Sequence, residues 1–422
     1  MAKKRHLRWL RLDNAAKIYP AARRRNWSNV FRLSATLTEP VDKAVLQAAL
    51  DVTVGRFPSM AARLRRGVFW YYLQELPRAP RLSEEYSAPL APMSKEEVRR
   101  CAFRVIAHEN RIAVEVFHSL TDGNGALVFL KTLTAEYLQQ KYGAAIPCTH
   151  GILDRTEAPA EEELEDSFLK YAGPVSADRR ERTAWHLEGT PDQCRLTCMT
   201  VDTKALLQKA HDYGVTATTY LCAVLLDALQ RLQAAEVPDR RKRKPLKVLL
   251  PVNLRKLFPS KSLRNFALYT TPELLPRLGS YSLDEICKIV CHHMALDITP
   301  KRMGMKIAVN VGSERSMAVK LLPLFIKNAV MKAVFDAVGE KKSCLTLSNL
   351  GLVQLPEEMA QFVTRMDFIL GVQAAAPHNC GVISYGDKTY LNFIRNIRES
   401  KLEYAFFRVL QEQGILCEAQ SN

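Results

Sequence analysis

The chain of 422 residues is 47% hydrophobic and 25% charged, which is typical of soluble globular proteins and excludes the disordered and fibrous classes. Its net charge of +16 indicates an anionic partner, such as a nucleic acid, a membrane surface or a phosphorylated small molecule. No apolar run approaches the roughly 20 residues of a membrane span, and no signal-peptide core follows the basic N-terminus, so we expect a cytoplasmic protein without a transmembrane segment.

The first half of the chain contains several short runs that alternate apolar and polar residues. Ile112, Val114 and Val116 share one face of such a run, as in a strand with one buried side. Leucines and Tyr137 then recur at helical spacing. These patterns predict strands over 29–37, 69–73, 99–107 and 112–117, and helices from Asp42 and over 125–142.

The stretch 147–191 is typical of a crossover between two halves. It combines an acidic run at 161–166 with a basic run at 178–182 and prolines at 159, 174 and 191. We place a boundary near residue 180, which gives a first domain over 1–180 and a second over 181–422.

The second half has the same style of pattern without the same sequence. Helices that flank sheets in both halves predict an α/β protein, with a two-layer α+β arrangement in each half. The predicted strands are 195–202, 246–252, 344–348, 366–370, 381–385 and 389–394, and the predicted helices are 203–213, 218–234, 283–298 and 401–413.

Ten cysteines are scattered singly, and no two of them have Cys-x-x-Cys spacing. In a chain without a secretion signal, free thiols are the expected state. The alternative is a zinc site built from Cys287, Cys291, His292 and His293. Those four lie in one helical pattern and no second ligand pair is evident, so we expect no metal.

Basic residues cluster at 3–11, 23–25, 63–66 and 240–244. No motif that reads DNA or RNA accompanies these clusters, and aromatic residues do not alternate with them. Each cluster alone is typical of a solvated surface loop. We therefore expect no nucleic-acid partner.

The segment from Val114 to Gly125 carries the clearest chemical signal. A strand delivers His118 to its end, and a short turn with Asp122 and Gly123 leads into the next helix. Histidine can accept a proton near neutral pH while it stays mostly uncharged, which suits a general base. Asp122 can pair with a distant arginine or orient the imidazole, and Gly123 permits a positive φ and a close backbone approach. The alternative is a structural histidine whose hydrogen bonds are made within its own loop.

A second His-x-x-x-Asp spacing occurs at His293 and Asp297 and serves as a control. Isoleucine instead of glycine follows Asp297, and the segment lies within a helical pattern rather than at a strand end. There the expected role is structural.

The segment Phe117-His118-Ser-Leu-Thr-Asp122-Gly123 resembles the His-His-x-x-x-Asp-Gly active-site motif of the superfamily of CoA-dependent acyltransferases. This superfamily includes chloramphenicol acetyltransferase, alcohol O-acetyltransferases, plant BAHD acyltransferases, wax ester/diacylglycerol acyltransferases and nonribosomal peptide condensation domains. Phe117 stands where the first histidine often stands, and the second histidine is the base.

Three further segments are similar to family elements, in family order. The segment from Arg11 to Pro20 resembles the N-terminus of bacterial alcohol acetyltransferase-like proteins. Asn253-Leu-Arg255 resembles the family's Asn/Asp-x-Arg element, and Ser348-Asn349-Leu-Gly351 its Ser-Asn-x-Gly strand end. The resemblance implies two chloramphenicol acetyltransferase-like domains with the active site in a tunnel between them.

By this resemblance, His118 is the general base that lets an acceptor attack a thioester directly, without an acyl-enzyme. Asp122 is expected to point away from substrate and pair with Arg255. The resemblance and the need for an oxyanion donor single out Ser348, Asn349 or a backbone amide near Gly123, and Asn265 is expected to line the channel. The alternatives are strand-end turn chemistry for Ser348 and Asn349 and a loop cap for Asn265.

The resemblance implies acyl-CoA as co-substrate, with no tightly bound cofactor, and an alcohol as acceptor. A basic loop that consists of Arg240, Arg241, Lys242, Arg243 and Lys244 could contact the CoA phosphates, or could be a plain surface loop. An acyl carrier protein with a phosphopantetheine arm would also suit a basic tunnel mouth.

Three hypotheses follow. The first is an O-acyltransferase that uses acyl-CoA. The second is a carrier-protein-dependent transferase or a condensation-type enzyme that forms amides. The third is a non-catalytic scaffold of the same fold, against which the presence of His118, Asp122, Gly123 and Arg255 argues. Both halves of the site lie in one chain, so we expect a monomer.

Overall fold

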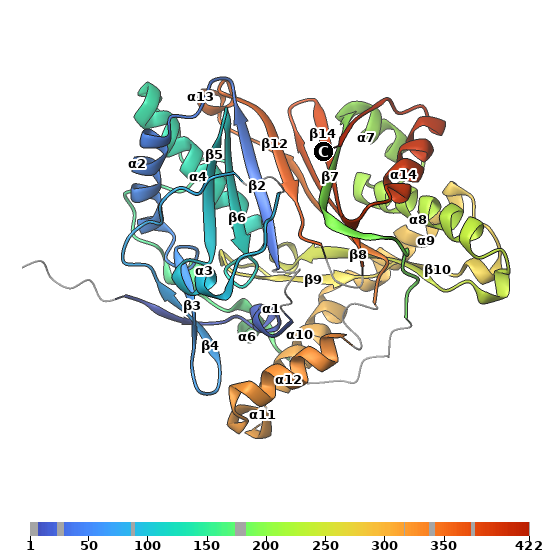
Figure 1. Ribbon diagram of the computed structural model, residues 1–422, viewed down its shortest axis with the longest axis horizontal. Helices are drawn as coiled ribbons and strands as arrows, with labels where there is room; N and C mark the ends of the chain where they lie inside the picture. Colours follow the sequence, from blue (N-terminus) through green and yellow to red (C-terminus); the bar gives the residue numbers. More distant parts are fainter. Residues whose placement is uncertain are drawn as a thin grey trace, which may run out of the picture.

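The structure is a computed structural model that describes residues 7–22, 29–85, 89–173, 183–315, 317–336, 342–372 and 376–421. It contains a four-stranded sheet, an eight-stranded sheet and a small three-stranded sheet. The two larger sheets lie side by side, with helices on their outer faces (Figure 1). The predicted α/β architecture is confirmed.

The four-stranded sheet has the order β12-β2-β6-β5, and each neighbouring pair is antiparallel. Helix α4 packs on β2 and β6, and α2 packs on α4. Asp42 begins α2 by accepting hydrogen bonds from the amides of Ala44 and Val45. The elements are β2 (Val30–Leu37), α2 (Lys43–Thr53), β5 (Phe103–His108), β6 (Arg111–Phe117), α4 (Gly123–Tyr142) and β12 (Val363–Ile369).

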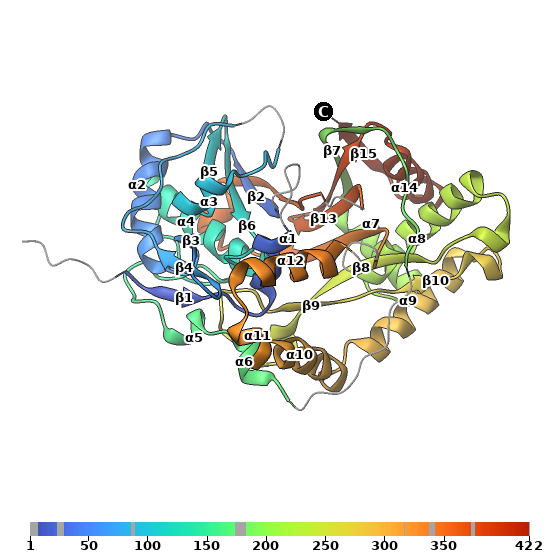
Figure 2. The same cartoon turned by 60° about the horizontal axis from the view of Figure 1, so that its bottom comes forward.

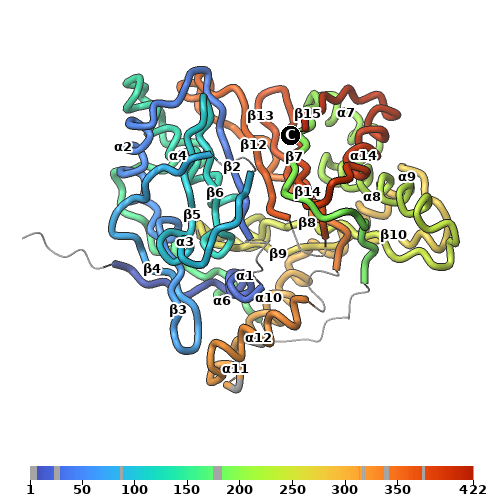
Figure 3. Tube along the Cα trace, in the orientation of Figure 1, coloured from blue at the N-terminus to red at the C-terminus, as the bar shows by residue number. Residues whose placement is uncertain are grey.

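Strand β12 comes from the second half of the sequence but completes the sheet of the first half. Phe368 of β12 lies opposite Leu33 of β2, and Figure 3 shows the two strands next to each other. The two halves therefore share a sheet. The predicted boundary near residue 180 falls outside the described residues, and the domain ranges 1–180 and 181–422 stay a prediction.

The eight-stranded sheet is mixed. Strand β11 runs parallel to both β13 and β8, while the other pairs are antiparallel. Helix α8 packs against α7, α9 and α14. The strands are β7 (Pro191–Asp202), β8 (Leu246–Asn253), β9 (Ala267–Thr270), β10 (Glu273–Leu274), β11 (Leu345–Val353), β13 (His378–Tyr385), β14 (Lys388–Ile397) and β15 (Cys417–Ser421); the helices are α7 (Thr203–Asp212), α8 (Ala217–Glu236), α9 (Leu283–Asp297) and α14 (Lys401–Glu412).

Two predicted elements of the first half need correction. The run 99–107 is not one strand, because Ser94 and Glu97 form a capping box that begins helix α3 (Lys95–Arg100), and β5 starts only at Phe103. The predicted strand 69–73 is β4 (Tyr71–Glu75), shifted toward the C-terminus. It lies in the small sheet between β1 (Trp9–Arg11) and β3 (Ala62–Arg66), which the patterns did not predict.

The region between β10 and β11 is helical and was also not predicted beyond α9. It contains α10 (Pro300–Arg315), α11 (Met317–Leu321) and α12 (Leu324–Val334). The remaining short elements are α1 (Ile18–Ala22), α5 (Glu161–Leu164), α6 (Ser167–Tyr171), α13 (Glu357–Ala360) and single 3-10 turns at Ala15–Lys17, Val54–Arg56, Arg240–Lys242, Leu254–Lys256 and Pro276–Leu278.

One apolar core covers the four-stranded sheet and includes second-half residues such as Phe368 and Ile383, a second lies within the second half, and a third, smaller cluster surrounds Phe266 and Met303. All ten cysteines are free. Within the described ranges, no three His, Cys, Asp or Glu side chains gather into a group that could hold a metal ion. In the same ranges, no helix combines the length and apolar character needed to cross a bilayer.

Candidate active site

The strand-turn-helix unit predicted around His118 is present. Strand β6 ends at Phe117, and the amide of His118 still donates a hydrogen bond to the carbonyl of Asn29 at 2.9 Å. Asp122 caps α4 by accepting from the amide of Gly125 at 3.1 Å. Because of this cap the helix begins at Gly123, two residues earlier than predicted. Sheet pairing on one side and the cap on the other thus fix the turn.

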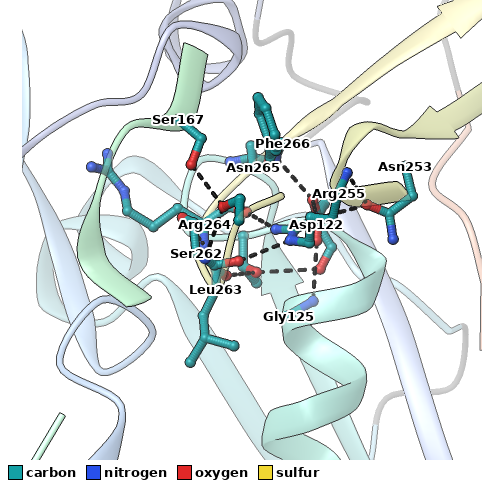
Figure 4. Close-up of polar contacts among 12 residues, drawn as sticks. Asp122, Gly125, Ser167, Asn253, Arg255, Ser262, Leu263, Arg264, Asn265 and Phe266 are labelled. Carbon is teal, nitrogen blue, oxygen red and sulfur yellow. Dashed lines mark hydrogen bonds and ion pairs between the residues drawn. The ribbon is translucent and has the colours of Figure 1, made fainter. Parts of the chain in front are cut away.

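The ion pair expected between Asp122 and Arg255 is also present. Nη1 of Arg255 lies 2.7 Å from Oδ2 of Asp122, which also accepts from the amide of Phe266 at 2.9 Å (Figure 4). Arg255 further donates to the carbonyls of Ser262 and Arg264. The guanidinium therefore joins the His118 turn of the first half to the loop 262–266 of the second half.

Glycines allow these two segments to approach closely. A Cβ atom at Gly125 would lie 2.1 Å from Oγ1 of Thr121 and 2.2 Å from the carbonyl oxygen of Leu263. At Gly123 it would meet only side chains, with Cδ2 of Leu350 nearest at 3.1 Å. Gly123 was predicted to permit a positive φ and a close backbone approach, but it is the first helical residue of α4 and has no positive φ, and the close backbone approach occurs at Gly125 instead.

Aromatic rings enclose the half-buried imidazole of His118. The ring of Tyr19, from α1, stacks on it with centroids 4.5 Å apart, and the ring of Phe31 contacts it edge-on at 5.0 Å. Tyr19 lies in the N-terminal segment that resembles the family, although sequence reasoning gave this tyrosine no role. The two rings leave the imidazole little freedom to rotate.

Asn265 defines which imidazole nitrogen carries the proton. Its Nδ2 atom donates to the carbonyl of His118 at 3.0 Å and to the carboxylate of Asp13 at 3.2 Å, and both of these groups are acceptors. Its Oδ1 atom therefore faces Nδ1 of His118, at 3.0 Å, so Nδ1 must be the donor. The lone pair of the neutral ring then lies on Nε2.

Burial lowers the pKa of His118 below its ordinary value of 6.5, and the charge of Asp122 and the bond to Asn265 oppose this shift only in part. The imidazole is therefore neutral near pH 7 and able to accept a proton. Burial likewise raises the pKa of Tyr19, so its hydroxyl stays protonated.

Asp13, which accepts a hydrogen bond from Asn265, and Arg264 form a buried pair next to the site. A guanidinium nitrogen of Arg264 lies 3.6 Å from Oδ2 of Asp13, and the amide of Ala16 donates to Oδ1 at 2.8 Å. Burial raises the pKa of Asp13, although Arg264 opposes this shift. Apart from the N-terminal resemblance, no sequence signal predicts this contact, because Asp13 and Arg264 are far apart along the chain.

The structure brings β11 close to this site at Leu350, which lies within the strand rather than at its end. Leu350 contacts Gly123, and Ser348 pairs with Gly381 within the sheet. The side chain of Asn349 is already hydrogen-bonded, since it donates to Oγ1 of Thr218 at 3.1 Å and accepts from the amide of Gly351 at 2.8 Å. These two bonds hold the Asn349 side chain at the irregularity within β11, and its role in binding an oxyanion stays a prediction.

The structure does not bring the basic loop to the site. Arg240, Arg241, Lys242, Arg243 and Lys244 precede β8, whereas Arg255 follows it, so the whole strand, roughly 25 Å, separates them. Arg243 donates to the carbonyl of Val237 at 2.9 Å. A surface cavity of about 330 Å³ lies near Gly55 and Arg78, and none of the predicted site residues lines it.

Comparisons with solved structures identify the fold. F. sporotrichioides TRI101 complexed with coenzyme A and T-2 is similar with a TM-score of 0.64 and 11% identity, over 98% of this chain and 99% of that one. The wax ester synthase/diacylglycerol acyltransferase from Marinobacter aquaeolei VT8 gives 0.55 and 14%, over 96% and 100%. The first condensation domain of the CDA synthetase gives 0.56 and 13%, over 95% and 94%. No protein-family model and no curated protein matches the sequence.

These likenesses extend over nearly the whole chain. The protein has the two-part fold that the chloramphenicol acetyltransferase-like acyltransferases and condensation domains share, as the resemblance predicted. In this chain, the predicted motif residues His118 and Asp122 meet Arg255 and Asn265 from the second half.

Proposed function

We propose that the protein is an acyltransferase that moves an acyl group from a thioester, acyl-CoA in the simplest case, to the hydroxyl of an alcohol. The observation that carries this proposal is the neutral imidazole of His118, whose Nδ1 proton Asn265 holds and whose Nε2 is left as the base. The fold shared with TRI101, which was crystallised with coenzyme A, and with a wax ester synthase supports the reaction class.

The proposed reaction needs one base and no acyl-enzyme. Nε2 of His118 takes the proton of the acceptor hydroxyl while the oxygen attacks the thioester carbonyl carbon, which forms a C–O bond and an oxyanion. When the oxyanion collapses, the C–S bond breaks, and the leaving thiolate takes the proton back from Nε2. The products are an ester and free thiol, and His118 returns to its neutral form.

Asn265 and the ion pair act as positioning groups in this scheme. The bond from Nδ1 to Asn265 keeps the tautomer and the ring orientation through the cycle. The pair of Asp122 and Arg255 holds the turn that carries His118, without contact to the reacting atoms. For the oxyanion we favour Ser348 or a backbone amide near Gly123, because the side-chain amide of Asn349 is already bound to Thr218 and Gly351.

Product analysis by mass spectrometry tests the proposal. Protein is incubated with acetyl- to palmitoyl-CoA and pooled alcohols and amines, beside His118→Ala and, as a matched control, His293→Ala from the other His-x-x-x-Asp segment. We expect ester from the wild type and from His293→Ala, and a rate at least about 100-fold lower from a folded His118→Ala. Ester formation by His118→Ala at the wild-type rate contradicts the proposal.

The likeness to a condensation domain favours one alternative donor, an acyl group on a carrier protein. The net charge of +16 suits an acidic carrier protein. If no product forms from free acyl-CoA, the same assay with acyl carrier protein as donor separates this enzyme from a non-catalytic scaffold. A scaffold gives no product with either donor.

A further inference from the structure

Helices α11 and α12 lie at the lower edge of the molecule in Figure 1. They expose apolar side chains that soluble proteins normally bury. On α12, Phe325 is 64% exposed and Val330 54%. The exposed set continues along α11 and onto the turn between β3 and β4. We call this set the apolar face, and it consists of Met317, Leu321, Leu322, Phe325, Val330, Val334, Val68 and Phe69.

The polarity of α12 is opposite to that of an ordinary surface helix. Lys327 points into the protein, where its Nζ atom donates to the carbonyl of Phe69 at 3.1 Å and lies 3.8 Å from the ring centre of Trp70. Asn328 donates to the hydroxyl of Tyr71 at 3.1 Å. The helix thus holds polar groups inward and turns the apolar face outward, which is expected where an apolar phase covers it.

The helices and the turn form one continuous surface. The amide of Leu324 donates to the carbonyl of Val68 at 2.9 Å, which joins the start of α12 to the tip of the β3–β4 hairpin. Val68 itself is 73% exposed. Nearby on β1, the exposed Trp9 stacks on Tyr72 of β4. Exposed aromatic rings beside aliphatic ones are typical of side chains that enter a lipid-water interface.

Positive charge borders the apolar face. Arg66, just before the turn, and Lys320, on α11, are both exposed. Glu314, near the end of α10, and Asp336, just after α12, are each ion-paired with a lysine. Apolar side chains with a basic border match the charge and chemistry of a membrane surface that contains anionic lipids.

We propose that the apolar face binds the surface of a membrane rich in anionic lipids, with Phe325, Val68 and Phe69 inserted among the acyl chains. The proposal does not depend on the enzymatic activity. It does place the site close to the lipid, because α12 packs on α1, which carries Tyr19 against His118 (Figure 2). A hydrophobic acceptor or acyl donor would then reach the site from the bilayer.

Vesicle sedimentation tests the proposal with the full chain. Vesicles of phosphatidylcholine alone are compared with vesicles in which about a third of the lipid is phosphatidylglycerol. We expect the wild type to bind the anionic vesicles, with an affinity that falls by about tenfold or more between about 0.1 M and about 1 M salt. The double variant Phe325→Asp/Val330→Asp should lose at least about tenfold in affinity.

A matched control changes exposed leucines elsewhere. Leu207→Asp/Leu296→Asp alters side chains that are 51% and 67% exposed on α7 and α9, and it should bind like the wild type. Thermal unfolding of all variants establishes that they are folded. A wild type that stays in the supernatant, or a Phe325→Asp/Val330→Asp variant that binds undiminished, overturns the proposal. A solution dimer that this variant dissociates also overturns it, because a second copy then covers the apolar face.

Discussion

Nδ1 of His118 lies 3.0 Å from Oδ1 of Asn265, although the two residues come from different halves of the chain. Because the other end of the Asn265 amide donates to Asp13 and to the His118 carbonyl, the amide cannot reverse without losing both bonds. The state of the proposed base in the first half is therefore set by a residue of the second half.

Asn265→Asp should shift the pH dependence of acyl transfer. A negative charge beside Nδ1 favours the imidazolium and so raises the pKa of His118, which burial lowers in the wild type. The second oxygen of the new carboxyl group replaces Nδ2 opposite Asp13, so the two acids share one proton and one negative charge remains beside His118. Since the base must be neutral, kcat/KM at pH 7 should fall and recover at higher pH. In the wild type, kcat/KM should fall only as the pH drops below 6.5.

The measurement is kcat/KM across pH for both proteins. Asn265→Ala, which adds no charge, is the control: it should lower kcat with little change in the position of the acid limb. An unchanged acid limb in Asn265→Asp would show that Asn265 does not set the protonation of His118.

Arg255→Met should destabilise the protein by about 3 kcal/mol, because it leaves the buried carboxylate of Asp122 without its cation. Urea denaturation measures the free energy of unfolding. Lys261→Met breaks the exposed pair of Lys261 and Glu162 in the neighbouring loop and should cause no measurable change. Equal effects of the two substitutions would contradict a special role for Arg255.

Gly125→Ala should cost about 2 kcal/mol or more of stability and most of the activity, because the new methyl group would meet the backbone oxygen of Leu263 at 2.2 Å. Gly123→Ala is the matched comparison, since there the methyl group meets no backbone atom, only the side chains of Leu350 at 3.1 Å and Phe368 at 3.4 Å. Thermal unfolding should separate the two variants. A Gly125→Ala protein as stable and active as Gly123→Ala would disprove the close approach.

Asp166→Asn should stabilise the protein at pH 8 and have little effect at pH 4. Burial and the nearby Asp13 raise the pKa of Asp166 from 3.8 to about 6. A raised carboxyl pKa penalises folding progressively as the pH rises from the unfolded pKa of 3.8 to the folded pKa of about 6, and above that pH the full penalty is about 3 kcal/mol. Near pH 4 the folded carboxyl is neutral and the penalty is small. Asparagine also preserves the cap that Asp166 gives to the amide of Phe168. Urea denaturation at both pH values checks this difference.

Local signals in the sequence were enough to predict the unit that carries His118. Alternation in β6, a glycine-containing turn and helical spacing in α4 all lie within one short segment, so periodicity reveals them. The pairing of Asp122 with Arg255 required more, because Arg255 is distant in sequence, and only the family resemblance connected the two.

Asn265 was predicted as a channel residue, but its bond to His118 and the place of Asp13 in the site escaped prediction for a physical reason. Asn265 and Asp13 are polar residues without a periodic or spaced pattern, and their contact depends on tertiary packing of two distant loops. The exposure of the apolar face of α12 could not be predicted either, because α12 has the largely apolar composition of a buried helix. Strand β12 was predicted as a strand, but no local pattern can tell which sheet it joins.

The place of β12 has a consequence for biosynthesis. The edge of β2 that β12 covers emerges early from the ribosome, whereas its partner is made after most of the chain, some tens of seconds later at roughly 5–20 residues per second. During that interval an apolar strand edge is unpaired and can join other nascent chains. An expression fragment that ends before Val363 should therefore aggregate or require a chaperone, even though it contains the whole His118 turn.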